Sequence, residues 1–147
     1  MPAETTPRAA LGPRSVTMRR IANSQYIVTN DRGGELRIGH GEGTDFTPVD
    51  LLLAAIGGCT AIDVDIVTSR RSEPGEFTVT VDGNKVKGAS GNQVADLRVT
   101  FHVTFPATAE GDEARAILPG IVRQSHDRLC SVGRTIENGT PIDTRIA

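Results

Sequence analysis

Alternation of apolar and polar positions predicts several short β-strands along the chain. The clearest are residues 77–82 and 94–105, where every second residue from Leu97 to Phe105 is apolar. Further strands are predicted at residues 25–29, 35–38 and 141–146. Turn residues at 30–34, at Gly83-Asn84 and at 88–92 separate these segments, and residues 85–87 are expected to pair back.

A long apolar run in the first half of the chain predicts a helix over residues 48–69. Thr47 suits the N-cap, Pro48 suits the first helical position, and Asp50 places a negative charge near the helix N-terminus. The segment is apolar on almost all sides, so we expect a buried central helix. Gly57-Gly58 lies in its middle, and each glycine costs about 1 kcal/mol there, so a kink or a restart is expected.

A second helical region follows the last long strand. Asp112 is expected to cap a helix over residues 113–118, Pro119-Gly120 to break it, and a second piece to run over residues 121–129. The predicted order is strands, helix, strands, helix and a closing strand, which indicates an α+β fold.

Composition limits the function classes that are open. With 16 Lys and Arg against 18 Asp and Glu, the net charge of −2 argues against a nucleic-acid partner. We find no run of about 18 apolar residues and no secretory signal, so no membrane partner and a cytoplasmic location are expected. Residues 1–15 are predicted to be a flexible tail and residues 16–147 a single domain.

Two cysteines are the first candidates for chemistry. If the helix restarts at Gly57-Gly58, backbone N–H groups near Cys59 would favour its thiolate, whereas Asp63, one turn later, would oppose it. Cys130 follows His126 by four residues, so both can share one helix face. The alternative interpretation is that both thiols are buried and inert.

A metal site is a weaker alternative. Cys59, His126, Cys130 and a carboxylate could surround zinc, but no C-x-x-C or H-E-x-x-H spacing is present. We therefore expect neither a metal nor another cofactor.

Two segments together resemble the OsmC/Ohr superfamily. The first is Thr-Pro-Val-Asp-Leu-Leu-Leu-Ala-Ala-Ile-Gly-Gly-Cys-Thr at residues 47–60, and the second is Ser-His at 125–126 through Cys-Ser-Val at 130–132. The resemblance extends over residues 16–146 and implies an OsmC-like α+β fold. In that fold, antiparallel sheets wrap around two central helices in an intertwined homodimer.

The resemblance also implies a thiol peroxidase that reduces organic hydroperoxides. Cys59 would be the peroxidatic thiol, Cys130 the resolving thiol, and an external dithiol the reductant. In the best-known members an acidic residue directly follows the helix-opening proline and pairs with an arginine. Here Val49 takes that place, so Asp50 and Arg20, with Arg19 beside it, are the candidates for supporting roles.

Two other interpretations remain open at this point. One is a non-catalytic dimer that binds a small apolar or reactive ligand beside the cysteines. The other is a structural dimer in which both thiols are buried and inert. Both remain open because a shared fold does not determine the reaction.

Overall fold

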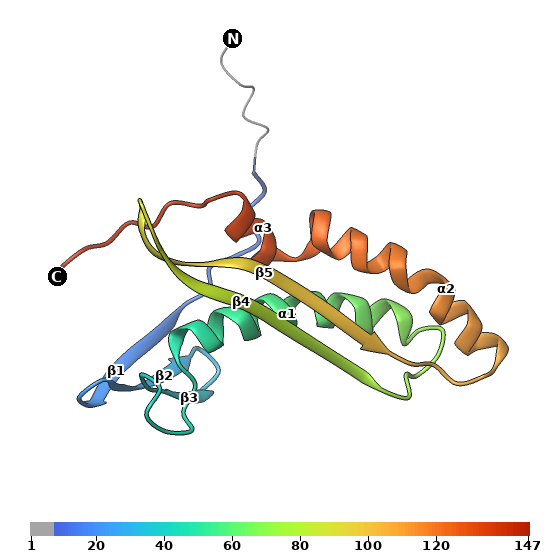
Figure 1. The fold of residues 1–147 in the computed structure, drawn as a ribbon, viewed down its shortest axis with the longest axis horizontal. Coiled ribbons are helices and arrows are strands. Elements are labelled where there is room, and N and C mark those ends of the chain that lie inside the picture. Colours follow the sequence, from blue (N-terminus) through green and yellow to red (C-terminus); the bar gives the residue numbers. More distant parts are fainter. Residues whose placement is uncertain (1–7) are drawn as a thin grey trace, which may run out of the picture. The chain divides into compact units, whose positions relative to one another are not determined.

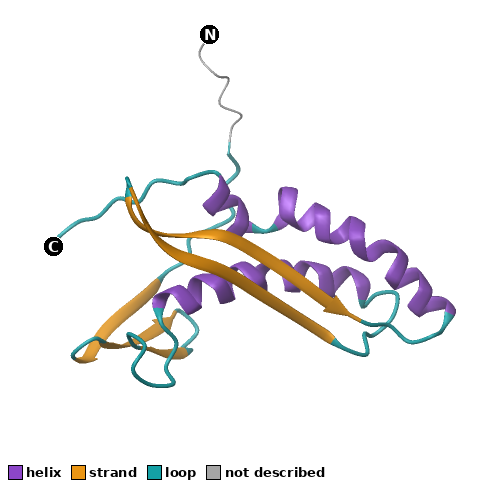
Figure 2. Ribbon diagram, viewed as in Figure 1, coloured by secondary structure: helices purple, strands orange, loops and turns teal. Residues whose placement is uncertain are grey.

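The computed structural model describes residues 8–147, in two compact units divided at Pro48. Residues 1–7, the first part of the predicted tail, lie outside the described residues. Residues 8–15 are exposed and form no helix or strand. The first unit carries a sheet, and the second combines a β-hairpin with helices (Figure 2).

The first unit contains a three-stranded antiparallel sheet in the order β1-β2-β3, formed by β1 (Val16–Ala22), β2 (Gln25–Asn30) and β3 (Glu35–Ile38). The predicted strands at 25–29 and 35–38 are therefore confirmed. The turn between them closes on Asn30, whose side-chain oxygen accepts hydrogen bonds from the N–H groups of Arg32 and Gly34. Gly33 has φ +85°, a conformation that glycine adopts without steric cost.

In the second unit, β4 (Phe77–Gly88) and β5 (Gly91–Val103) form one long antiparallel hairpin. The turn predicted at Gly83-Asn84 is wrong, because the ladder continues past it with a shift in register between Asp82 and Asn84. A Cβ at Gly83 would lie 2.7 Å from Val94 Cγ1, so only glycine allows this close approach. Phe77 and Phe101 pack edge to face, with ring centroids 6.3 Å apart.

Helix α1 (Pro48–Thr68) begins at the predicted proline and continues through both glycines. The predicted restart at Gly57-Gly58 is therefore wrong, and Cys59 does not lie at a new helix N-terminus. Packing explains one of the two glycines: a Cβ at Gly57 would lie 2.6 Å from Val81 Cγ2 on β4, whereas a Cβ at Gly58 would meet nothing within 4 Å.

This difference predicts opposite effects of the same substitution at adjacent positions. Gly58→Ala should stabilise the protein by up to about 1 kcal/mol, because alanine is the better helix former. Gly57→Ala should destabilise it, because a stiff valine must shift, and the two variants should differ by about 1–3 kcal/mol. Thermal or urea unfolding measures the difference, and equal stability of the two variants would contradict the close packing of α1 on β4.

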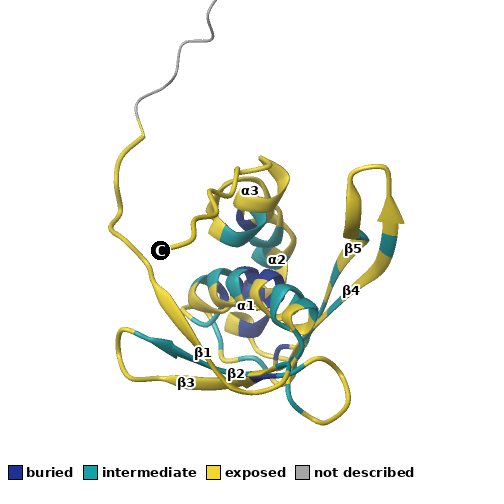
Figure 3. Ribbon diagram, turned by 90° about the vertical axis from the view of Figure 1, so that its left-hand side faces the viewer, coloured by how far each residue is buried: buried dark blue, intermediate teal, exposed yellow. Residues whose placement is uncertain are grey.

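Burial of α1 is less complete than its composition predicts. Ile56, Thr60 and Val64 form one buried stripe, whereas Ile62 and Ile66 are 61% and 51% exposed. The helix lies beside α2 and along the β4–β5 hairpin (Figures 1 and 3). These two elements cover one side of α1, which is why only one stripe is buried in the single chain.

By length and composition alone, α1 also meets the criterion for a membrane-spanning helix, which the sequence-based expectation overlooked. It is the only described helix that does so. Asp63 and Asp65 lie within it, and the Asp63 carboxylate is hydrogen-bonded to Ser125 of the same unit. Asp63 is therefore paired inside the protein, and the absence of a membrane partner remains a prediction.

After β5 the chain forms α2 (Ala109–Gln124), a π-helical turn η1 (Ser125–Leu129) and α3 (Ser131–Glu137). The N-cap of α2 is Thr108, whose hydroxyl accepts from Gly111 N–H, rather than the predicted Asp112. The predicted break at Pro119-Gly120 is also wrong, since α2 contains Pro119 in its interior. The proline removes one backbone hydrogen bond from the helix, and α2 nevertheless continues to Gln124.

The predicted closing strand is not formed. Residues 141–147 have no regular structure and are exposed, with Ile142 90% exposed. A strand needs a neighbour for its backbone N–H and C=O groups, and the described chain places none beside this segment.

Candidate functional site

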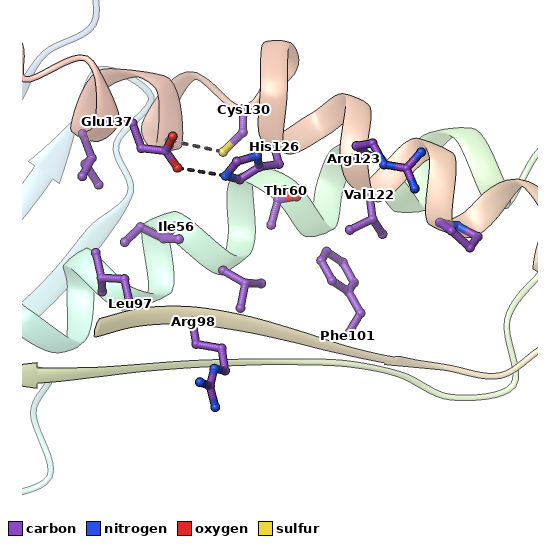
Figure 4. Close-up of a pocket in the computed structure, with 14 residues that line it drawn as sticks. Ile56, Thr60, Leu97, Arg98, Phe101, Val122, Arg123, His126, Cys130 and Glu137 are labelled. Atoms are coloured by element: carbon purple, nitrogen blue, oxygen red, sulfur yellow. Dashed lines mark hydrogen bonds and ion pairs between the residues drawn. The ribbon is translucent and has the colours of Figure 1, made fainter. Parts of the chain in front are cut away.

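A cavity of about 680 Å³ lies in the second unit between α1, β5 and the region from α2 to α3. Thr60, Phe101 and Val122 point into the same space from three different elements (Figure 4). Most of the lining is apolar, and its charged members are Arg98, Arg123, His126 and Glu137. This volume and character are typical of sites for small organic molecules.

Cys130 lines this cavity and is 3% exposed. Its N–H donates to Ser125 C=O at 2.9 Å, the bond that closes the π-helical turn. Cys130 also occupies the N-cap of α3, where its Sγ accepts from Gly133 N–H at 3.4 Å. The turn and the cap together hold this thiol in place, and π-helical turns are frequent at functional sites.

The structure brings Cys59 next to Cys130. Cys59 is half-buried on α1, and it lies close enough to Cys130 to raise the pKa of the Cys130 thiol. Both cysteines are free thiols. The roles that the resemblance implies for the two cysteines require such closeness, although Cys59 does not belong to the cavity lining.

Burial raises the pKa of the Cys130 thiol, and Gly133 N–H partly offsets this effect. Cys59 and the negative charge of Asp63 raise the pKa further. Cys130 is therefore held as the protonated thiol at neutral pH. These surroundings do not favour nucleophilic attack by its sulfur on a substrate.

A buried hydrogen-bond network joins α1 to the π-helical turn beside the two thiols. Thr60 Oγ1 and Ser125 Oγ are 2.7 Å apart, and Ser125 Oγ donates to Asp63 Oδ2 at 2.8 Å. Ser125 is fully buried and Thr60 is 7% exposed. Sequence analysis includes Thr60 and Ser125 in the two motifs but assigns them no role, although the hydroxyl directly after Cys59 is visible in the sequence.

His126 connects the π-helical turn to α3. Its Nε2 lies 2.9 Å from Glu137 Oε1, its Nδ1 lies 2.9 Å from Asp127 Oδ1, and Arg134 completes the group by pairing with Glu137. The hydrogen bond to Asp127 is the largest effect that raises the pKa of His126, and Glu137 raises it further. The ion pair with Arg134 lowers the pKa of Glu137.

These shifts predict a pH-dependent contribution of the His126–Glu137 pair to stability. Protonated His126 stabilises the folded state below pH 6.5, and this contribution is lost as pH rises through its raised pKa. Ionised Glu137 contributes above pH 4.5, and its contribution is lost as pH falls through its lowered pKa. The pair is therefore strongest between these limits.

We expect His126→Gln to lower the urea midpoint at about pH 5.5 more than at about pH 8.5. The change should be small, because the His126 side chain is 63% exposed. His40→Gln, which removes a histidine from the first unit, is the control. A loss of stability that is independent of pH would indicate that His126 acts only through packing.

The residues predicted to support Cys59 lie on two elements. Arg19 and Arg20 are on β1 in the first unit, and Asp50 is in the first turn of α1. Their roles toward Cys59 remain predictions. No group of three or more His, Cys, Asp or Glu side chains among residues 8–147 is placed to hold a metal.

Comparison with known proteins identifies the class of protein that this fold defines. Residues 39–145 match the family described as OsmC-like protein, so the chain belongs to the OsmC-like family. Over residues 8–147, the mixed α and β structure, with antiparallel sheets and three α-helices, agrees with solved OsmC-like structures.

An OsmC-like protein of unknown function from Vibrio cholerae matches with a TM-score of 0.70 and 13% identity, over 86% of this chain and 95% of that one. The organic hydroperoxide resistance protein OhrB of Bacillus subtilis matches with a TM-score of 0.55 and 20% identity, over 88% and 94%. By sequence, the uncharacterized protein Mb2948c of Mycobacterium bovis is 25% identical over 134 residues, 88% of this chain and 93% of its own length.

Proposed function

We propose that the protein is a thiol-dependent peroxidase for organic hydroperoxides, with Cys59 as the peroxidatic thiol and Cys130 as the resolving thiol. The observation that carries this proposal is the closeness of two free thiols from separate elements. Similarity in fold to proteins named for organic hydroperoxide resistance supports the same reaction class.

In the first step the Cys59 thiolate attacks the outer oxygen of the hydroperoxide and the O–O bond breaks. The sulfur is oxidised by two electrons to a sulfenic acid, and the alkoxide leaves as the alcohol after taking up a proton. In the second step Cys130 attacks the Cys59 sulfur, a disulfide forms and water leaves. An external dithiol then reduces the disulfide by exchange and becomes oxidised itself.

The difference between the two thiols supports these roles. Cys59 is the more accessible sulfur, whereas Cys130 is buried and its raised pKa keeps it protonated. A protonated neighbour does not compete for peroxide. It attacks the adjacent sulfenic acid as it loses its proton, which the departing hydroxide takes up to leave as water. The apolar cavity beside Cys130 would hold the organic part of the substrate.

The decisive experiment follows cumene hydroperoxide consumption by the reduced protein in a stopped-flow instrument. We expect rapid consumption by the wild type and none above background by Cys59→Ser. Peroxide loss at equal rates in both proteins, or in neither, would overturn the assignment of Cys59.

The second candidate function is a non-catalytic protein that binds a small apolar ligand. One observation favours it: among the described residues that line the cavity, Cys130 is present and Cys59 is not. Tight binding of a hydroperoxide's alcohol product, together with no peroxide consumption, would support this function over the peroxidase.

We further infer that the protein is a homodimer. Ile62 and Ile66 on α1 and Ile142 and Ile146 at the C-terminus are large, exposed apolar side chains that a second copy could cover. Sedimentation at low micromolar concentration should show a species of twice the 15.6 kDa chain mass. A single 15.6 kDa species would contradict this inference.

A further inference from the structure

The hydrogen bond between Ser125 and Asp63 joins the two elements that carry the cysteines. Asp63 lies one helical turn after Cys59 on α1, so the two side chains share a helix face. Ser125 begins the π-helical turn, and its C=O accepts from Cys130 N–H at 2.9 Å. Each member of the pair is therefore a single turn from one of the two thiols.

Proton positions in this network follow from its geometry. Ser125 has one hydroxyl proton and donates it to Asp63 Oδ2 at 2.8 Å, so the contact with Thr60 at 2.7 Å requires Thr60 to donate to Ser125 Oγ. Ser125 thus both donates and accepts while it is fully buried. Loss of its hydroxyl would take from the buried Thr60 hydroxyl its partner, so this network is sensitive to substitution of Ser125.

The hydrogen bond between Ser125 and Asp63 lies where a small displacement of the π-helical turn would change the position of Cys130 relative to Cys59. A π-helical turn inserts one extra residue relative to an α-helix, and here a side-chain hydrogen bond joins the turn to α1. Ser125 provides this contact at the first residue of the turn, and Cys130 is the residue directly after it. Disulfide formation requires the two sulfurs to meet in one narrow geometry.

We propose that Ser125 and Asp63 are positioning residues that set the approach of Cys130 to Cys59, and so set how readily the disulfide forms. Neither residue acts on the peroxide itself. The proposal uses the two thiols of the proposed function, but it concerns their mutual equilibrium, which can be measured without any peroxide.

The test measures the Cys59–Cys130 disulfide equilibrium of the full chain in buffers of reduced and oxidised dithiothreitol, with thiols counted by alkylation and mass. Ser125→Ala should lower the effective concentration of the two thiols by at least about tenfold. Thr68→Val is the matched control, since Thr68 is another fully buried hydroxyl of the second unit that bonds only within α1. We expect the control to stay within about twofold of the wild type.

Asp63→Asn separates position from charge. The asparagine oxygen can still accept from Ser125, so the disulfide equilibrium should remain close to that of the wild type. Because the negative charge is removed, Cys130 in the reduced protein should alkylate faster at neutral pH. Ser125→Thr keeps the hydroxyl and should restore most of what Ser125→Ala loses.

Distinct outcomes overturn the two proposals. A Ser125→Ala effect no larger than that of Thr68→Val, or a wild-type protein that forms no internal disulfide, overturns the positioning role. If Ser125→Ala does not fold, Asp63→Ala removes the same bond from the half-buried side and must show the same loss. A normal disulfide equilibrium without peroxide consumption would reject the peroxidase and leave the positioning role intact.

Discussion

Cys130→Ser should consume about one equivalent of hydroperoxide per chain in a fast burst without sustained turnover, while the wild type continues with a dithiol reductant. The first step needs only Cys59, but without a neighbouring thiol the sulfenic acid has no internal partner. With excess peroxide, Cys59 should then be oxidised to the sulfinic acid, which dithiols do not reduce. Stopped-flow kinetics give the burst, and mass spectrometry gives the oxidation state of Cys59.

The control is Cys59→Ser, which should show neither burst nor turnover. Sustained turnover by Cys130→Ser at the wild-type rate would show that an external thiol resolves the sulfenic acid directly. Cys130 would then not be the resolving thiol, and the ligand-binding interpretation would gain support.

If Arg20 supports Cys59, Arg20→Ala should slow alkylation of Cys59 at least several-fold at neutral pH, because a cation beside a thiol stabilises the thiolate. Alternate residues of a strand point to opposite faces, so Arg19 and Arg20 on β1 cannot both face the same group. Arg19→Ala is therefore the matched control. Alkylation rates by mass, with Cys130 as the internal reference, measure the effect.

Asp50→Asn should produce a similar but smaller slowing if Asp50 holds the arginine in place. Equal alkylation rates of Cys59 and Cys130, unchanged in either arginine variant, would favour the interpretation that both thiols are inert. A slowing caused by Arg19→Ala alone would assign the supporting role to the other face of β1.

Local sequence determined most of the secondary structure and the chemically important residue types. Thr47-Pro48 marks the start of α1, because proline is suited to the first helical turn, and alternation defines the long strands β4 and β5. The two cysteine motifs also carried the family resemblance, which the match over residues 39–145 confirms. These features depend on neighbouring residues, so they are visible in the sequence.

Tertiary packing determined the features that local rules predict wrongly, namely the continuity of α1, β4 and α2. Local rules predict breaks at Gly57, Gly83 and Pro119. Each of the two glycines instead allows the close approach of a valine from another segment, and α2 continues through Pro119. The network that joins Asp63 to Ser125 depends in the same way on residues far apart in the chain. Sequence spacing shows which residues share one turn of a helix. Contacts between distant segments form only when the chain packs, and the packing energy then outweighs local propensity.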